Sequence, residues 1–291
     1  MAGVVPGYSW FVLFLLVIIN TQQLWSRYSF NYLYNVSSED PYVSMKVDVD
    51  LSYGEYGFLT GYGFSSSGFL TGLVAGRAAD VWTRTLLIGV GCFIWNGALF
   101  MIWASTTFSE MVFWRLALGF GQAFTGPASY SLIADYFPES QRSQANGLFA
   151  CGIYLGGGLA SVCIPMSARV GWRATCAYVS AIGLGLAFVE VCGVIEPKRS
   201  SDKSAGSLGA NDFLGAMATI FRNRLARVVF AASAARFMGG YAIAGYLPTY
   251  YGVIFPSHNH EYAYINAYVV ALGGFLSSRG SGVTVSASWN H

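Results

Sequence analysis

The feature that most constrains the fold of this chain is a series of eight long apolar segments separated by polar links. Each segment is close to the roughly 20 residues that a helix needs to cross the hydrocarbon core of a bilayer. Only 10% of the residues are charged, whereas soluble domains have about a quarter. The sequence therefore predicts an all-α polytopic membrane protein. Its expected spans are residues 9–33, 55–78, 86–105, 110–134, 143–166, 172–195, 226–251 and 261–278.

Basic residues in the links are unevenly distributed between the two sides of the predicted membrane. Only Lys46, Arg169 and Arg173 follow odd-numbered spans. The links after even-numbered spans contain Arg77, Arg84, Arg142, Lys198, Arg199, Lys203, Arg222 and Arg224. Because an excess of Lys and Arg marks cytosolic links, we expect a multi-pass protein with a cytosolic N-terminus. The sequence does not distinguish the plasma membrane from an endolysosomal membrane.

The link Gly76–Arg84 is short, charged and placed between two apolar segments. A link this short forces the two helices to be antiparallel neighbours, with Arg77, Asp80 and Arg84 at the membrane surface. We expect Gly76 to end the first of these helices, where a small residue lets two backbones approach closely.

Three motifs of this chain resemble the major facilitator superfamily. Gly76, Asp80 and Arg84 match the family pattern Gly-x-Leu-Ala-Asp-Arg-x-Gly-Arg-Arg between its second and third helices. Residues 115–123 are similar to Arg-x-x-x-Gly-x-Gly-Gln-Ala of its fourth helix, and residues 135–142 to Asp-x-Phe-Pro…Arg of the next link. The resemblance implies a major facilitator fold and a transporter, not an enzyme, that moves a small organic solute by alternating access.

A further resemblance concerns one branch of that family. Residues 236–243 and the pair Leu247-Pro248 resemble the seventh helix of protist spinster-like members. Gln122 departs from this branch, which often has Glu at that position.

The expected domain organisation follows the family pattern only in part. We expect an N-terminal six-helix bundle in residues 1–196 and a cytosolic linker with a short amphipathic segment in 197–224. The first two helices of a C-terminal half follow in 225–278, and 279–291 is a polar tail outside the family pattern. Since family members have six plus six helices, the chain reads as truncated. The alternatives are a genuine eight-span protein, or a non-transporting fragment that is an interaction partner of a full-length transporter.

Polar residues recur along one face of the first span. Asn20, Gln23, Arg27 and Asn31 are spaced by three and four residues, which places them on the same side of a helix. Polar side chains are costly in lipid, so this face should line a cavity. Similar faces occur in the fourth and seventh spans, and the resemblance implies that all three converge on a central pathway. The further candidates for it are Arg115, Gln122, Arg236 and Tyr241.

Three of these candidates, Arg27, Arg115 and Arg236, carry positive charge into the predicted pathway. This excess favours an anionic or zwitterionic solute. The alternative is that each arginine caps helix carbonyls or pairs with an acid of an outer link, and Arg115 is the first candidate for such a structural role.

A cytosolic gate is the second predicted site. We expect Asp80 to accept hydrogen bonds from a helix N-terminus and Arg84 to pair with Asp135 or Glu139. Breaking this cluster would then allow the two halves to rock. The alternative is that these charges only fix the topology. The gate comprises Gly76, Asp80, Arg84, Asp135, Glu139 and Arg142.

Coupling to an ion would need an acid inside the protein. Glu55, at the start of the second span, and Glu190, in the sixth, are the two candidates. Glu190 could instead reach towards the surface near Lys198. A facilitator and a symporter therefore both stay open.

Two stripes of small residues predict close helix packing. They comprise Gly57, Gly61, Ser65, Gly68, Gly72 and Gly76 in the second span, and Gly152, Gly156 and Ala160 in the fifth. No cofactor or metal site is expected, because His258 and His260 lack supporting ligands. With a net charge of only +2, nucleic acid is not an expected partner. The expected partners are a lipid bilayer, a small solute and a coupling ion if transport is coupled.

Overall fold

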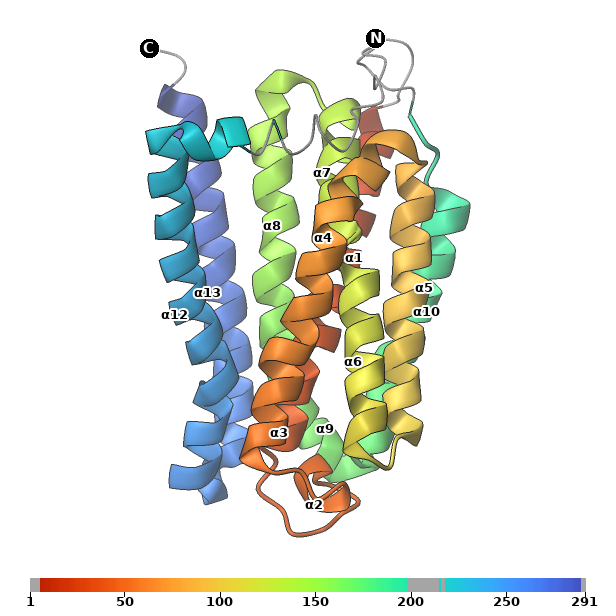
Figure 1. Ribbon diagram of the computed structural model, residues 1–291, viewed down its shortest axis with the longest axis vertical. Coiled ribbons are helices and arrows are strands. Elements are labelled where there is room, and N and C mark those ends of the chain that lie inside the picture. The colour runs from red at the N-terminus through yellow and green to blue at the C-terminus, as the bar shows by residue number, and fades with distance from the viewer. Residues whose placement is uncertain (1–5, 198–214, 216–217, 289–291) are drawn as a thin grey trace.

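The computed structural model describes residues 6–197, 215 and 218–288. The described part is a set of long helices running roughly parallel to one another (Figure 1). The N-terminal bundle contains α1 (Pro6–Tyr34), α2 (Met45–Asp48), α3 (Tyr53–Gly57), α4 (Gly63–Val81), α5 (Arg84–Ala104), α6 (Phe108–Gln122), α7 (Thr125–Tyr136), α8 (Glu139–Ser161), α9 (Cys163–Val170) and α10 (Trp172–Gly193). A five-residue π-helix, η1 (Phe58–Tyr62), joins α3 to α4.

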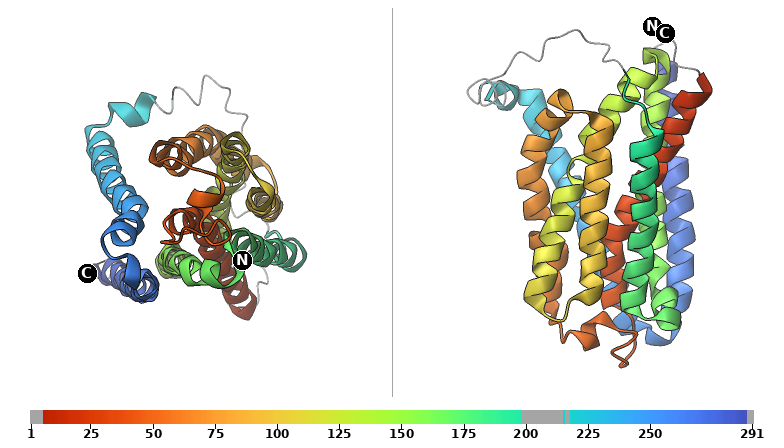
Figure 2. Two further views of the ribbon diagram at one scale, coloured as in Figure 1. Left: turned by 90° about the horizontal axis from the view of Figure 1, so that it is seen from below. Right: turned by 90° about the vertical axis from the view of Figure 1, so that its right-hand side faces the viewer.

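Two more long helices, α12 (Arg224–Ile254) and α13 (Asn259–Ser288), lie together on one side of this bundle (Figures 1 and 2). The short 3-10 helix η2 (Pro256–His258) connects them. Asn223 begins α12, because its side-chain oxygen accepts a hydrogen bond from the Leu225 amide at 2.9 Å. The expected amphipathic segment of the linker runs from Asn211 to Ile220, and most of it lies outside the described residues.

Five helical runs among the described residues are both long and apolar enough to cross a membrane. They are Gly7–Tyr34, Arg84–Ala104, Glu139–Val170, Trp172–Gly193 and Arg224–Ile254. The second and fourth predicted spans are helical but interrupted, by η1 and by a break at Ala123–Phe124 between α6 and α7. The eighth predicted span lies in the continuous helix α13, which is not among the five runs.

The short links at one end of the bundle have the arrangement that antiparallel neighbours require. The α4–α5 link is only Trp82 and Thr83, and the α7–α8 link is only Phe137 and Pro138. Both links lie at the end that carries the N-terminus, whereas α2 lies at the opposite end (Figure 1). We call these the N-terminal end and the α2 end.

The predicted role of Gly76 as a helix end was wrong. Helix α4 continues through Gly76 to Val81, and a Cβ added at Gly76 would meet no neighbouring atom within 4 Å. The sequence between Gly76 and Trp82 contains no proline, so the α-helix continues to the short link that leads into α5. No close backbone approach therefore requires a glycine here.

The two stripes of small residues have different neighbours. On α8, Gly152 and Gly156 face α1 so closely that an added Cβ would overlap α1 backbone atoms. On α4 and its preceding π-helix, Gly61 and Gly72 face open space and Gly68 has only one distant neighbour. Close packing is therefore confirmed for the fifth-span stripe, whereas among the glycines of the second-span stripe only Gly57 and Gly68 have a neighbour within 4 Å of an added Cβ.

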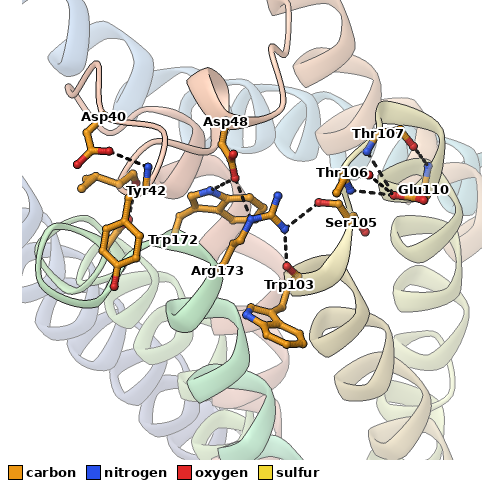
Figure 3. A network of polar contacts seen from close by, with 12 residues as sticks. Asp40, Tyr42, Asp48, Trp103, Ser105, Thr106, Thr107, Glu110, Trp172 and Arg173 are labelled. Atoms are coloured by element: carbon orange, nitrogen blue, oxygen red, sulfur yellow. Dashed lines mark hydrogen bonds and ion pairs between the residues drawn. The ribbon is translucent and has the colours of Figure 1, made fainter.

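At the α2 end, a polar network fixes the chain that follows α1 (Figure 3). The Asp48 carboxylate accepts hydrogen bonds from Trp172 Nε1 at 2.9 Å and from Arg173 Nε at 2.8 Å. Arg173 also donates to the Ser105 carbonyl at 2.8 Å, at the end of α5. Because these contacts join α2, α5 and α10, they close the bundle at this end.

The C-terminal helices contact the bundle unequally. Ser161 on α8 donates to the Ala263 carbonyl of α13 at 2.8 Å, and Gly158 lies against the Ala267 carbonyl, so α13 packs closely on α8. In α12, Pro248 is the one buried residue. We expected residues 279–291 to be a polar tail, but α13 continues past Ser278 to Ser288. The stretch contains no proline that would end the helix.

Candidate solute cavities and end cluster

Two adjoining cavities lie between the bundle and α12, with volumes of about 500 and 560 Å³. Arg27, Tyr28 and Tyr241 line both of them. All eight predicted pathway residues line one or the other. The first cavity is lined by Arg27, Asn31, Arg115, Gln122 and Tyr241, and the second by Asn20, Gln23, Arg27, Arg236 and Tyr241. The structure thus brings together polar faces of spans one, four and seven.

Arg27 is held by an amide network across the break between α6 and α7. Its Nε donates to Gln122 Oε1 at 3.0 Å. Gln122 Nε2 in turn donates to the Gln23 carbonyl at 3.0 Å and to Ser26 Oγ at 3.1 Å. Since Gln122 is the last residue of α6, the interrupted fourth span places this amide beside α1. The other two Arg27 nitrogens make no hydrogen bond within the described residues.

Arg115 is 1% exposed and makes its hydrogen bonds to backbone carbonyls. Its Nε donates to the Leu59 carbonyl of η1 at 3.2 Å, and Nη1 donates to the Arg27 carbonyl at 3.4 Å. The guanidinium also lies 4.6 Å from the ring centre of Phe30 and 5.4 Å from that of Phe64. The carbonyl-capping alternative therefore describes part of what Arg115 does, and the same side chain also lines the first cavity.

The two cavities carry an excess of positive charge. Arg27 and Arg115 line the first, and Arg236 lines the second from the exposed surface of α12. Arg27 and Arg115 both lie against Phe64, with Arg27 at 4.7 Å from the ring centre. Within the described part of the chain, no Asp or Glu lines either cavity. The aromatic ring stabilises the two cations partly, and a bound anion would stabilise them further.

The two asparagines among the pathway residues make bonds between helices. Asn20 Nδ2 donates to the Phe149 carbonyl of α8 at 2.9 Å. Asn31 Nδ2 donates to the Ala244 carbonyl of α12 at 3.4 Å. Each residue lines a cavity while one hydrogen of its side-chain amide already bonds a neighbouring helix, so helix association accounts for part of their polarity in this structure.

The two candidate coupling acids lie in different surroundings. Glu55 accepts hydrogen bonds from the Ser52 amide at 2.9 Å and the Ser52 hydroxyl at 2.7 Å, in a capping box that begins α3. Glu190 is 0% exposed, and neither of its carboxyl oxygens has a hydrogen-bond partner among the described residues. The alternative that Glu190 reaches the surface was therefore wrong. Neither acid lines the two cavities.

At the N-terminal end, Arg84 is the centre of a charged cluster. Its Nη1 lies 2.5 Å from Asp135 Oδ2 and its Nε lies 2.7 Å from Glu196 Oε1, while its own side chain is 2% exposed. Ser131 adds its hydroxyl and its carbonyl as acceptors for Nη1, at 2.9 and 3.1 Å. The cluster joins α5, α7 and the chain just after α10, all within the N-terminal bundle.

The other predicted gate residues do not join this cluster. Asp80 is exposed and makes no hydrogen bond within the described residues. Glu139 is 3.8 Å from Arg142 on the same helix, and Arg142 Nε donates to the Phe137 carbonyl at 3.0 Å. Arg84 therefore selects Asp135 of the two expected acids. Because its described partners all lie in one half, breaking these bonds would not by itself separate the halves.

Glu196 is the acid of this cluster that sequence reasoning missed. One of its oxygens accepts from Arg84, and the other accepts from the Thr85 amide at 3.1 Å, at the start of α5. A carboxylate is favourable at a helix N-terminus. The available signal was an acid placed just before Pro197, on the same predicted side as Arg84.

These features define the class of the molecule as a helical membrane protein with charged, polar cavities between two groups of helices. The sequence model of the Major Facilitator Superfamily matches residues 8–288. The chain belongs to this family. Membership in a family of transporters, not of enzymes, agrees with the motifs of the α4–α5 link and of span four.

Among known proteins, the chain is 26% identical over 158 residues to the "Probable L-galactonate transporter" of Escherichia coli (strain K12). This match covers 54% of the chain and 35% of that protein. Two solved structures of a bacterial homolog of the human lysosomal transporter Spinster share the fold, both at 21% identity and both covering 94% of this chain. The inward-facing unoccupied form has a TM-score of 0.75 and the occupied form 0.68. The chain spans 61% and 60% of those structures.

Proposed function

We propose that this chain carries the solute site of a membrane transporter for a small organic anion. The observation that carries the proposal is the pair of cavities lined by Arg27, Arg115 and Arg236 and, within the described residues, by no acidic side chain. Moving an unpaired guanidinium into a membrane interior is costly, so a solute carboxylate that pairs with it binds favourably. A zwitterion would bring a cationic group that these cavities leave without a partner.

The Escherichia coli relative supports the same chemical class. The name of that protein gives L-galactonate, a hydroxylated carboxylate, as its solute. The carboxylate would bind Arg27 and Arg115 in the first cavity, and the amide of Gln122 keeps Arg27 oriented towards it. Hydroxyl groups would meet the polar residues Thr60 and Ser65 on the wall formed by the second span.

We further propose that transport occurs by alternating access, in which the bundle and the C-terminal helices move as two bodies. Arg84, Asp135 and Glu196 keep three elements of the bundle together at its N-terminal end during this motion. Coupling to protons is proposed only through Glu190, since Glu55 is engaged as a helix cap. A facilitator remains the simpler form of the proposal.

The proposal is tested by solute binding to the full chain in lipid nanodiscs, measured by calorimetry. L-galactonate is the probe, and neutral L-galactono-1,4-lactone and the cation choline are the comparison solutes. We expect binding of the anion alone, with an affinity at least about tenfold lower in Arg27→Ala, the effect of losing a charged hydrogen-bonding partner. Arg142→Ala, at the bundle surface, is the matched control and should bind as the parent does. Preferential binding of choline, or equal binding of anion and lactone, would defeat the proposal.

Uptake into sealed vesicles containing the same chain separates transport from binding. Transport predicts saturable accumulation of labelled L-galactonate that Arg27→Ala reduces. Binding in nanodiscs without uptake in vesicles would instead support the non-transporting alternative. That outcome would leave the anion site intact.

A further inference from the structure

The proline in α12 leaves a backbone acceptor without its helical donor. In a regular helix, the amide at position 248 would donate to the carbonyl of Ala244, but Pro248 has no amide hydrogen. Pro248 is also the one buried residue of α12, so its surroundings are occupied by protein. A carbonyl at this depth needs another donor.

The bundle supplies that donor and a second one beside it. Asn31 Nδ2 of α1 donates to the Ala244 carbonyl at 3.4 Å. The Tyr56 hydroxyl of α3 donates to the next carbonyl, that of Gly245, at 3.0 Å. Tyr56 is 2% exposed and stacks on Tyr34 with ring centres 4.0 Å apart, so its hydroxyl is held in position. Pro248 thus removes one hydrogen bond within α12, and the carbonyl that it leaves bonds to the N-terminal bundle instead.

A second set of hydrogen bonds lies nearer the C-terminal end of α12. The Ser37 hydroxyl donates to the Gly252 carbonyl at 3.1 Å. Asn259, at the start of α13, donates to the Asn35 carbonyl and to Ser37 Oγ, each at 3.1 Å. A Cβ at position 252 would lie 3.1 Å from the Asn35 carbonyl, so the glycine allows this close approach.

The bonds between α12 and the bundle are confined to one end of the helix. All the hydrogen bonds described between them use carbonyls in the stretch from Ala244 to Gly252, near the α2 end. The described residues of α12 before Ala244 make no hydrogen bond to the bundle. Helix α12 is therefore fastened at its α2 end and free of such polar contacts along the rest of its length.

We propose that Asn31 and Tyr56 form a latch that keeps the α2 end of the molecule closed, Asn31 through the Ala244 carbonyl that Pro248 leaves without its helical donor and Tyr56 through the neighbouring Gly245 carbonyl. The latch lies directly beside the first cavity, which Asn31, Tyr56 and Gly245 also line. Opening the cavity at the α2 end requires both bonds to break. Asn31 is then a positioning residue between two groups of helices and not a solute ligand.

The latch is tested by pulsed electron–electron double resonance, which measures the distance between two spin labels, on the full chain in nanodiscs without solute. Spin labels are attached at Val47→Cys on α2 and Val253→Cys on α12, both exposed positions, with the exposed Cys192 replaced by Ser. We expect one short distance in the parent. Tyr56→Phe and Asn31→Ala should each raise the ratio of a longer-distance population about fivefold, the ratio equivalent to one hydrogen bond of about 1 kcal/mol.

Two further variants make the test specific. Tyr53→Phe is the matched control, since its hydroxyl lies on the same helix but contacts only Lys46 among the described residues. It should leave the distances unchanged. Pro248→Ala restores the amide that reclaims the Ala244 carbonyl, so adding Asn31→Ala to it should have little further effect, while adding Tyr56→Phe should still open the α2 end.

The proposal is overturned if neither Asn31→Ala nor Tyr56→Phe changes the distances between the spin labels. Full additivity of Asn31→Ala and Pro248→Ala would also overturn it, because the two changes are expected to act on one carbonyl. The labels report the closure without any solute. Failure of the latch and failure of the anion site are therefore seen in separate measurements.

Discussion

At the scale of single residues, the buried Arg84 and Arg115 and the half-buried Arg27 differ in what neutralises their charge. Arg84 lies between the carboxylates of Asp135 and Glu196, so its charge is compensated within the bundle. Arg27 and Arg115 instead contact an amide, backbone carbonyls and the Phe64 ring. Neutral partners orient a guanidinium without cancelling its charge. This difference separates an arginine that holds the fold from arginines that can bind a solute.

We predict that Arg84→Ala lowers the free energy of unfolding of the bundle by about 3 kcal/mol, because it removes the buried guanidinium that joins the carboxylates of Asp135 and Glu196. The measurement is thermal unfolding of the purified chain in detergent, followed by circular dichroism. Arg142→Ala is the control, and its weak ion pair at 3.8 Å should contribute less than about 1 kcal/mol. Equal effects of the two substitutions would contradict the assignment of Arg84 as the centre of the cluster.

At the scale of helices, interruptions place functional groups that a continuous helix would not. The π-helix η1 presents the Leu59 carbonyl to Arg115, and the break after Gln122 brings its amide to Arg27. Interruptions of this kind often occur at functional sites. Residues of both interruptions line the first cavity, among them Thr60 and Gly61 of η1 and Gln122 and Ala123 at the α6–α7 break.

The stripes of small residues predict opposite effects of the same substitution. Gly156→Ala on α8 should destabilise the fold by about 2 kcal/mol or more, because its Cβ would overlap the Thr21 carbonyl and the Leu24 side chain. Gly76→Ala on α4 meets open space and should stabilise the helix by up to about 1 kcal/mol. Thermal unfolding of both variants in one detergent checks the pair. A loss of stability in Gly76→Ala would show a contact that the described structure lacks.

At the scale of the whole molecule, the hydrophobic core belongs to the N-terminal bundle. Among the described residues, the buried core cluster lies in α1 to α10 and their links, with only Tyr262 and Ala263 from α13. Helix α12 adds only Pro248 to the buried residues. We therefore expect the N-terminal bundle to be an independent folding unit, to which α13 is packed and α12 is fastened at one end.

We predict that a chain of residues 1–197 folds by itself in detergent, with the helix content expected from α1 to α10 and cooperative thermal unfolding. Its midpoint should fall only slightly, because the contacts of α8 with Ala263 and Ala267 are lost. A chain of residues 1–171, which lacks α10 and Glu196, is the control and should not unfold cooperatively. Aggregation of the longer fragment, with the full chain remaining monodisperse, would contradict this division.

The expected fold follows from local properties of the sequence. Hydropathy and the placement of basic links predict antiparallel helices, and a spacing of three and four residues predicts that Asn20, Gln23 and Arg27 share one face. These patterns depend only on helix geometry and on the cost of polar groups in lipid. They therefore appear in the amino-acid order before any tertiary contact exists.

Only the packing of distant segments decided the remaining features. Arg84 and Glu196 are 112 residues apart, so their pairing depends on how α5 and α10 meet. Gly76 and Gly156 look alike in sequence, but one faces open space and the other faces the α1 backbone. The partner of the carbonyl that Pro248 releases comes from α1. Helices are set by local periodicity, whereas the neighbours of each side chain are set by three-dimensional contacts that no local pattern encodes.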